Sequence, residues 1–268
     1  MNKKKGMVHK VMTDMAKKSA LITNVENIGT GIYSMWLKQE DIAAAAKPGQ
    51  FISVYLNDKT KLLPRPISLC ETDKEGGLLR IVYRVAGEGT KQLSEYKTGD
   101  CVDILGPLGN GFMTEGFSEA ILIGGGIGIP PMLELAKNLN CRKTIVLGYR
   151  NKETFLSDEF KKYGDVVIAT EDGSVGTKGN VIDAIKACGV KGDMIMACGP
   201  TPMLRGIKAY AQENPVKAQL SLEERMACGI GACLACVCKS KEKDHHTNVN
   251  NKRICKDGPV FFAEEVEL

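Results

Sequence analysis

Four cysteines near the C-terminus constrain the fold of this chain more than any other feature of its sequence. Cys228, Cys233 and Cys236 follow the spacing C-x4-C-x2-C, and Cys255 lies well beyond them. This is the spacing of plant-type [2Fe–2S] clusters, whose fourth thiolate is remote from the other three. Small residues fill the intervals, and glycine tolerates the left-handed backbone that a loop wrapped around a cluster needs. These thiols are therefore expected to hold a [2Fe–2S] cluster, which carries single electrons.

This segment also allows a zinc site, a different fourth ligand and a histidine-containing metal site, but each fits the sequence less well. A structural zinc site usually shows two C-x2-C-type pairs, whereas here three cysteines form one group and the fourth stands alone. Cys238 lies two residues after Cys236, and in a strand both thiols would share a face, so geometry does not exclude Cys238 as a ligand. The plant-type spacing, with its distant fourth thiolate, favours Cys255. His245 and His246 lie in a polar stretch that is typical of a solvated loop rather than of a metal site.

The composition is that of an ordinary globular protein, and it argues against several functional classes. The 268 residues carry a formal net charge of +4, too small and too dispersed to suggest binding to nucleic acid. The most apolar stretch, 120–135, is interrupted by glycine and proline, so no membrane span is expected. No apolar segment follows the lysines near the N-terminus, which argues against a signal peptide and favours a cytoplasmic location.

After an N-terminal extension, 1–18, to which no role can be assigned from its residues, the first large segment of the chain is rich in short β-type runs. Segment 19–115 then contains runs that partly alternate apolar and polar residues between Gly, Pro and Asp. They lie at 50–56, 78–85 and 100–105. Several such runs predict a small antiparallel β-barrel.

Segment 116–222 alternates between predicted strands and helices. The strands are expected at 120–124, 144–149, 165–170, 193–198 and 217–221, with helices such as 131–140 and 201–213 between them. Repeated βα units predict a five-stranded parallel sheet with helices on both faces. Segment 223–268 is too short for a large core and is expected to be organised by its cluster. The predicted fold class is thus multidomain, with a β-barrel, an α/β domain and a small C-terminal [2Fe–2S] domain.

Three short motifs in the barrel segment suit a flavin dinucleotide. Arg65 stands before a rigid proline and can hold a pyrophosphate bidentately, while Ser68 can hydrogen-bond a heteroaromatic ring. Gly89 and Thr90 are expected to lead into a helix whose free N–H groups and dipole attract a phosphate. Each motif alone is weak, but their order along one barrel favours FAD. The residues predicted to bind it are Arg65, Pro66, Ile67, Ser68, Val82, Tyr83, Arg84, Gly89 and Thr90.

Two turns in the α/β segment suit a second nucleotide. The first strand runs into a glycine-rich turn that lacks the Rossmann pattern but leads to a helix with proline at its start. The fourth strand ends at Cys-Gly-Pro, and both turns follow carboxyl ends of parallel strands, where open sheets bind ligands. The alternative is a pair of tight turns without a ligand. The residues expected to seat a nicotinamide nucleotide are Gly124, Gly125, Gly126, Gly128, Cys198, Gly199 and Pro200.

With these motifs assembled, the chain resembles the electron-transfer subunit of class 1B dihydroorotate dehydrogenase, within the ferredoxin–NADP reductase superfamily. The resemblance extends from about residue 19 to the end, and the cluster segment is its most specific part. It rests on segments 65–68, 82–84, 89–90, 106–112, 124–128, 226–236 and 255–261. Residues 1–18 and the long polar stretch between Cys236 and Cys255 depart from the family pattern.

The resemblance implies an electron relay with FAD, a [2Fe–2S] cluster and NAD as substrate, and with no catalytic residue of its own. Dihydroorotate would be oxidised on the FMN of a separate catalytic subunit, in pyrimidine biosynthesis, and electrons would pass through the cluster and FAD to NAD⁺. A heterotetramer of two catalytic and two electron-transfer subunits is implied. The alternative is a reductase subunit of an NAD(P)H–ferredoxin or sulfide dehydrogenase. In those proteins an aspartate commonly replaces one cluster cysteine, whereas all four positions are cysteine here.

The sequence alone does not decide the roles of some residues near the two nucleotide sites. Ile67 stands where the superfamily often has an aromatic residue that stacks on the flavin, so ring packing must come from elsewhere. Glu223 precedes the cluster loop and suits either a contact with the flavin or an ordinary surface salt bridge. Glu171 and Asp172 would oppose a 2′-phosphate, whereas Arg150 would favour one. The preference for NAD therefore follows from the resemblance more than from these residues.

Overall fold

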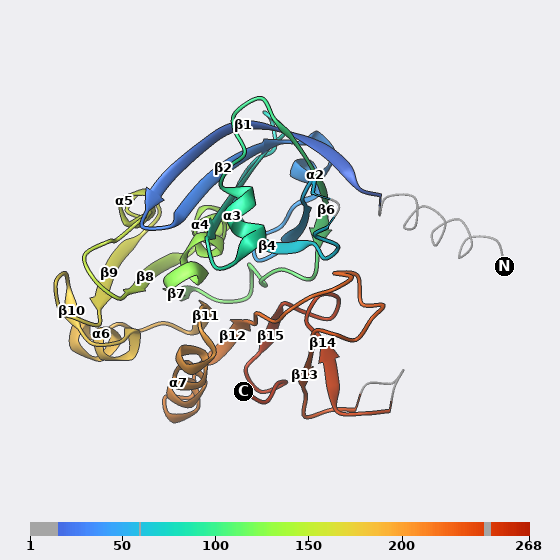
Figure 1. Cartoon of the computed structure of the whole chain (residues 1–268). Coiled ribbons are helices and arrows are strands. Elements are labelled where there is room, and N and C mark those ends of the chain that lie inside the picture. Colours follow the sequence, from blue (N-terminus) through green and yellow to red (C-terminus); the bar gives the residue numbers. More distant parts are fainter. Residues whose placement is uncertain (1–15, 59, 244–247) are drawn as a thin grey trace.

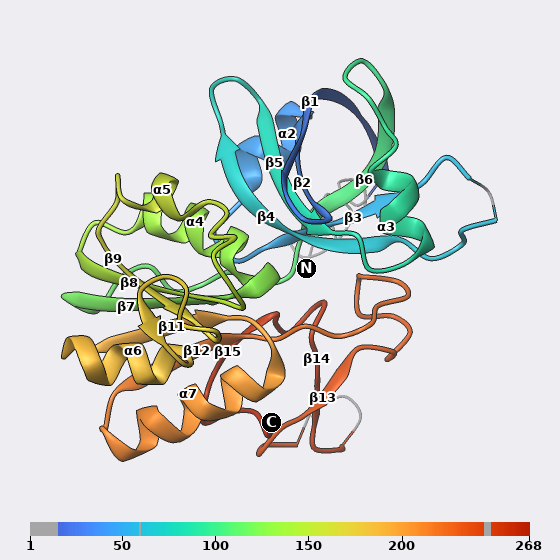
Figure 2. The ribbon, with the colours of Figure 1, turned by 60° about the vertical axis from the view of Figure 1, so that its left-hand side comes forward.

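The computed structural model describes residues 16–58, 60–243 and 248–268, which form a β-barrel, an α/β unit and a C-terminal segment (Figure 1). Seen from a second direction, the barrel lies above the α/β unit and the C-terminal segment (Figure 2). The C-terminal segment touches both other parts, since β15 (Val260–Phe262) joins the sheet and Asn110 bridges to Pro259. None of the described helices is long and apolar enough to cross a membrane. His245 and His246 lie outside the described residues.

The barrel is closed and antiparallel, as predicted, with the strand order β1-β2-β5-β4-β3-β6. Its strands are β1 (Lys18–Gly29), β2 (Ile32–Lys38), β3 (Phe51–Tyr55), β4 (Arg65–Asp73), β5 (Leu78–Arg84) and β6 (Cys101–Leu108). Strand β3 is buried on both faces. Ile52 and Val54 belong to the barrel core, whereas Phe51 belongs to a core shared with the α/β unit and the C-terminal segment. The outer face of β3 is therefore covered by the rest of the molecule.

The α/β unit contains a seven-stranded sheet in the order β10-β9-β8-β7-β11-β12-β15. The five predicted parallel strands are confirmed as β7 (Glu119–Gly125), β8 (Arg142–Tyr149), β9 (Asp165–Thr170), β11 (Met194–Cys198) and β12 (Lys217–Ser221). Two strands extend the predicted sheet: β10 (Thr177–Lys178) is parallel to β9, and β15 is antiparallel to β12. Strands this short carry too little alternation for their sequence to reveal them.

Helices cover both faces of the sheet, as predicted. One face carries α6 (Val181–Cys188) and α7 (Thr201–Glu213), and the other carries α4 (Ile129–Asn138) and α5 (Ser157–Phe160). Helix α7 has the predicted bounds, but α4 begins two residues before the predicted start at 131. Two prolines lie in its first turn, where their missing N–H groups would have no helical partner in any case.

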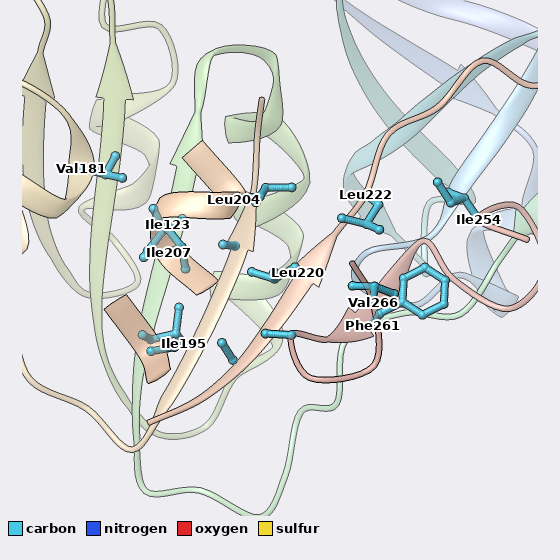
Figure 3. Close-up of a cluster of buried hydrophobic side chains, with 14 of the residues drawn as sticks. Ile123, Val181, Ile195, Leu204, Ile207, Leu220, Leu222, Ile254, Phe261 and Val266 are labelled. Atoms are coloured by element: carbon cyan, nitrogen blue, oxygen red, sulfur yellow. The ribbon is translucent and has the colours of Figure 1, made fainter. Parts of the chain in front are cut away.

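The C-terminal segment continues the core of the sheet rather than standing apart from it (Figure 3). Leu220 and Leu222, at the end of β12, pack in the same buried cluster as Ile254 and Phe261. The segment also contains a small hairpin of β13 (Val237–Lys239) and β14 (Asn251–Arg253). Apolar contacts with the sheet therefore organise this segment together with its cysteines.

Buried charges join the barrel to the α/β unit. The carboxylate of Glu134 on α4 is 2% exposed and accepts hydrogen bonds from the N–H and hydroxyl of Thr72 on β4, at 2.8 and 2.6 Å. On β5, Arg80 donates to both carboxylate oxygens of Glu159 on α5, at 2.6 and 3.1 Å. Because a buried charge is costly without its partners, these contacts hold the helical layer in one position against the barrel.

Candidate functional site

A cleft of about 1040 Å³ lies between the barrel, the start of α4 and the segment that follows β12. Its volume is at the upper end of the range for small-molecule sites. Every residue predicted to bind FAD lines it, namely Arg65, Pro66, Ile67, Ser68, Val82, Tyr83, Arg84, Gly89 and Thr90. Its opposite wall comes from Ile127, Pro131, Pro259 and residues 221–226. The cleft is therefore bounded by the barrel, by the start of the cluster segment and by the glycine-rich turn that follows β7, called the nucleotide turn below.

The glycine–threonine motif is built into a helix rather than placed before it. Helix α3 (Glu88–Leu93) begins one residue before Gly89, so the expectation that Gly89 and Thr90 precede the helix is slightly wrong. The Thr90 hydroxyl accepts the N–H groups of Ala86 and Gly87 at 2.8 and 3.2 Å and donates to the Gly87 carbonyl at 3.0 Å. This side chain thus fixes the shape of the turn that faces the cleft.

Tyr83 brings an unsatisfied polar atom to the cleft. Its hydroxyl is buried and has no hydrogen-bond partner among the described residues. Its ring stacks on Tyr33, with centroids 6.0 Å apart and an interplanar angle of 16°. Burial, and secondarily Tyr33, raises the pKa of the Tyr83 phenol, so the group stays protonated and able to donate. A polar ligand in the cleft would satisfy this hydroxyl, which fits the residues to a flavin nucleotide.

Glu223 lies where the flavin cleft meets the nucleotide turn. Glu223 lines the cleft, and desolvation raises the pKa of its carboxyl while the Arg84 guanidinium opposes that shift, although the residue as a whole is exposed. A methyl group at Gly126 would lie 3.7 Å from Nη2 of Arg84. The Glu223 charge also acts on the buried thiol of Cys198, whose pKa is raised mainly by burial. Arg84 and Glu223 therefore line the cleft at the place where it approaches Gly126 and Cys198 of the two turns.

The two turns predicted to seat the nicotinamide nucleotide meet at one point of the sheet. Strands β7 and β11 are neighbours, and the chain proceeds from β7 toward β8 on one side and from β11 toward β12 on the other. Their carboxyl ends form a topological switch point, where open sheets bind ligands. A Cβ atom on Gly128 would overlap the Cys198 carbonyl and the Gly199 nitrogen. The turns pack so closely that only glycine fits at this position.

The other residues predicted to seat the nicotinamide nucleotide lie in the same two turns. Gly124 and Gly125 end β7, and Pro200 caps the N-terminus of α7. A Cβ atom on Gly125 would overlap Met203 of α7 and lie 3.4 Å from the Pro200 ring. Because Ile127 lines the flavin cleft, the nucleotide turn reaches the edge of that cleft.

The four predicted cluster ligands lie in two pairs. The Cys233 thiol lies close enough to that of Cys228 to affect its protonation. Cys255 donates its N–H to Sγ of Cys236 at 3.4 Å, and the two thiols also interact. Burial and the neighbouring Cys236 raise the pKa of the Cys255 thiol to about 12, so this pair retains a proton that a metal would displace.

Backbone N–H groups converge on Cys228. Its Sγ accepts from Ile230 at 3.4 Å and from Ala232 at 3.3 Å. Partial burial raises the thiol pKa, but these N–H groups and Cys233 outweigh that effect, and the pKa of Cys228 falls to about 6. The thiolate is the form that ligates metal, so the loop favours the state that a cluster needs.

The backbone of the cysteine loop is left-handed at three positions. Gly229, Gly231 and Leu234 have φ angles of 70°, 83° and 59°. The Gly231 N–H donates to Sγ of Cys255 at 3.1 Å, which links the loop to the distant fourth cysteine. The expected use of glycine in a wrapping loop is therefore confirmed at two positions, and a leucine shares this conformation at the third.

The paired arrangement agrees with the way four thiolates divide between the two irons of a cluster. No three His, Cys, Asp or Glu side chains in the described part of the chain are placed to hold one metal ion. Structural zinc gathers four ligands around one ion, whereas a [2Fe–2S] cluster has two irons that share four thiolates. Two pairs of thiols fit the cluster better than zinc. Cys238 lies on β13 opposite Lys252, and its thiol packs half-buried against the shared core.

Sequence reasoning missed several residues of the cleft. Phe51 supplies an aromatic side chain to its wall, which Ile67 does not, and it pairs with Ser68 across β3 and β4. Leu222 and Met226 approach from the cluster side. The alternation around Phe51 indicates a strand, but only the register between β3 and β4 places its ring beside the flavin motif.

Two family models match the chain. The oxidoreductase FAD-binding domain matches residues 20–112, and the iron-sulfur cluster binding domain of dihydroorotate dehydrogenase B matches residues 223–267. Together they cover the barrel and the cysteine segment. The solved structure of a ferredoxin reductase in carbazole 1,9a-dioxygenase covers 75% of this chain and 66% of its own, with a TM-score of 0.65 and 19% identity. At that identity the likeness concerns the fold alone.

Closer relatives cover nearly the whole chain. The dihydroorotate dehydrogenase B (NAD(+)) electron transfer subunit of Fusobacterium nucleatum is 44% identical over 253 residues, which are 90% of this chain and 95% of that protein. The protein of the same name from Bacillus mycoides is 41% identical over 262 residues, 95% and 100% of the two chains. A solved structure of an NADH-dependent reduced ferredoxin-NADP oxidoreductase is 33% identical, with a TM-score of 0.84 over 92% of this chain and 89% of its own.

Proposed function

This chain belongs to the family of dihydroorotate dehydrogenase B (NAD(+)) electron transfer subunits, and from that premise we propose how its residues serve the relay. It is an oxidoreductase subunit that uses FAD, a [2Fe–2S] cluster and NAD, and it works with a catalytic partner that oxidises dihydroorotate. FAD exchanges electron pairs with nicotinamide and single electrons with an iron–sulfur cluster. One observation carries the proposal: residues 221–226 line the flavin cleft and lead directly into the cysteine loop that begins at Cys228.

The barrel residues hold FAD. Arg65 binds the pyrophosphate, and Gly89 leaves room for its guanidinium. Thr90 fixes the turn by accepting the N–H groups of Ala86 and Gly87, and Gly89 and Thr90 hold a phosphate at this turn. Ser68 contacts the edge of the flavin ring, and the unpaired Tyr83 hydroxyl donates to the cofactor. These roles are supported by the cleft that the five residues share.

The switch point between β7 and β11 holds the nicotinamide nucleotide. Gly128 lets the two turns close on each other there, and the turn at Ile127 brings the nucleotide to the flavin cleft. Glu223 and Arg84 stand at the junction, where the nicotinamide ring meets the flavin edge. We assign Glu223 a positioning role there, since it lines the cleft near enough to Arg84 for their charges to interact.

The cysteines divide between the two irons. Cys228 and Cys233 ligate one iron, and Cys236 and Cys255 ligate the other, as their pairing supports. Cys238 stays outside the ligand set. The corresponding division of the chain is a FAD domain at 19–115, a NAD domain at 116–222 and a cluster domain at 223–268, after an extension at 1–18.

The face around Cys233 binds the catalytic partner. Cys233 is exposed, and Ile230, Leu234 and Val237 expose 38, 46 and 37% of their surface beside it. Apolar side chains gathered beside an electron carrier are typical of a protein interface. The partner holds FMN, and the complex is a heterotetramer of two subunits of each kind in the cytoplasm.

One observation favours a second candidate. The solved NADH-dependent reduced ferredoxin-NADP oxidoreductase is similar over 92% of this chain. A reductase subunit of that class would pass electrons to or from ferredoxin instead of dihydroorotate. Four cysteine ligands and the more similar curated relatives favour the first candidate.

Mixing the purified chain with the FMN-containing catalytic subunit separates the two candidates. The mixture should reduce NAD⁺ with dihydroorotate, and the chain alone should catalyse only NADH–dye reduction. Dihydroorotate oxidation by the chain alone would contradict the division of labour. Reduction of ferredoxin but no coupling to dihydroorotate would support the second candidate. Co-purification from the native cell, with the partner identified by mass spectrometry, provides an independent check.

A further inference from the structure

Ser53 on β3 has a buried hydroxyl without a partner. The side chain is 0% exposed, and its Oγ makes no hydrogen bond among the described residues. Leaving a buried polar group unsatisfied costs about 1–3 kcal/mol. Such a group in a barrel wall calls for a partner that the described part of the chain does not supply.

The hydroxyl faces the cysteine loop and not the barrel core. A Cβ atom on Gly229 would lie 2.8 Å from Oγ of Ser53, and Gly229 follows the ligand Cys228 directly. Side chains on one face of a strand are two residues apart, so Phe51 and Tyr55 share the face of Ser53. All three contact the C-terminal side: Phe51 and Tyr55 pack in the shared core. The charge of Cys228 also raises the pKa of Tyr55, after burial.

The surroundings of Ser53 contain little that could bond to it. Its register partners are Pro66 on β4, which has no N–H, and Leu105 on β6. On the loop side, the next atom near Gly229 is a methyl carbon of Leu108. The hydroxyl therefore lies between an apolar barrel wall and the loop that carries the first cluster ligand.

We propose that the Ser53 hydroxyl donates a hydrogen bond to a sulfur of the cluster held by this loop, and so tunes the reduction potential of the cluster. The inference rests on the cluster assignment made above. Hydrogen bonds to cluster sulfurs stabilise the reduced state, which carries more negative charge, and so raise the potential. Because Ser53 pairs with Pro66 of the flavin motif, one strand then joins the flavin site to the cluster.

The test compares the wild-type holoprotein with Ser53→Ala by EPR-monitored redox titration. At a fixed ambient potential, the ratio of reduced to oxidised cluster should fall roughly tenfold in Ser53→Ala, which is about 59 mV for a one-electron couple. The FAD potential, measured optically in the same sample, should stay unchanged. Ser53→Thr keeps the hydroxyl and should retain the wild-type cluster potential. If Ser53 had a purely structural role, Ser53→Ala would shift the reduction potentials of both the cluster and FAD, or of neither.

A second measurement covers the case in which Ser53→Ala loads its cluster poorly. Pulsed EPR of the reduced wild-type cluster in D₂O should detect exchangeable deuterons, and the small fraction of loaded Ser53→Ala should lack one coupling. Equal potentials together with equal couplings would overturn the inference while leaving the cluster assignment intact. A wild-type protein without a [2Fe–2S] signal would instead overturn the assignment, and with it the inference. If the Ser53 hydroxyl instead bonds to a buried water, Ser53→Ala should change neither the cluster potential nor the deuteron couplings, so the experiment also identifies this case.

Discussion

Gly89 on α3 lies directly against the guanidinium of Arg65 on β4, so that a Cβ atom on Gly89 would overlap it. The backbone of Gly89 does not require glycine, since its φ is not in the left-handed region. Glycine is needed here because the two flavin motifs, far apart in sequence, occupy adjoining space. The position of Arg65 in the cleft therefore depends on the missing side chain of a residue on another element.

Gly89→Ala should displace Arg65 and weaken FAD binding. Loss of a charge-assisted contact with a phosphate costs about 1.5–3 kcal/mol, so FAD should dissociate roughly tenfold to a hundredfold more readily. Equilibrium dialysis with absorbance at the flavin band measures this. Gly206→Ala is the matched control, because that glycine lies inside α7 with nothing within 4 Å of its Cβ position. Unchanged FAD affinity in Gly89→Ala would contradict the role given to Arg65.

Cys255→Ser and Cys238→Ser should differ sharply in cluster content. Cys255 is paired with Cys236 and receives the Gly231 N–H, whereas Cys238 faces Lys252 across a hairpin. The first variant should lose most of its iron and its EPR signal, and the second should retain both. Iron analysis of anaerobically purified protein measures the difference. The reverse pattern would reassign the fourth ligand to Cys238.

Asp193 should make stability depend on pH at the acidic end. It accepts the N–H and hydroxyl of Ser118 and the N–H of Glu119, at 2.9, 2.8 and 3.0 Å, and these bonds lower its pKa. A carboxyl with a lowered folded-state pKa stabilises the fold above its unfolded pKa, and this stabilisation is lost as the pH falls through the folded pKa.

Asp193→Asn should therefore destabilise the protein by less than about 1 kcal/mol near pH 7, because the carboxylate is exposed and screened by solvent, and the difference should shrink as the pH falls through the lowered folded-state pKa. Denaturant unfolding across this pH range measures it. Asp165→Asn, at the exposed start of β9, provides the control substitution. If Asp193→Asn lowered the free energy of unfolding equally at neutral and at acidic pH, the bonds to Ser118 and Glu119 would not depend on the charge of Asp193.

Leu234→Asn should weaken binding to the catalytic partner. The residue is 46% exposed and has a φ of 59°, a conformation that asparagine tolerates, so the loop should keep its fold. Removing an apolar contact at an interface should lower the affinity about tenfold, measured by calorimetry, while NADH–dye reduction is unchanged. Leu21→Thr, on the exposed side of β1, is the control. Equal affinities for the two variants would place the interface elsewhere.

Local motifs could be predicted because each one carries its chemistry within a few residues. Arg65 and Ser68 share one cleft with the Gly89 turn because the start of β4, which carries both residues, forms part of the cleft wall. The parallel strands were recognisable from their apolar runs, and the switch point between β7 and β11 follows from the order of the βα units.

Contacts between distant segments could not be predicted. β15 is three residues long and joins the sheet only because the C-terminal segment folds back onto β12. The burial of Phe51 and Ser53 on the outer face of β3 has the same origin, since the C-terminal segment covers that face. Alternation reports which side chains are apolar, but it does not report what covers them.

The most direct test of the relay is an anaerobic reductive titration of the isolated chain, followed by absorbance and EPR. With dithionite, the protein should accept about three electrons per chain, two on the flavin and one on the cluster. NADH should also reduce the flavin and produce the EPR signal of a reduced [2Fe–2S] centre. An uptake of about two electrons without an EPR signal, or stoichiometric zinc in place of iron, would contradict a relay from nicotinamide through FAD to a cluster.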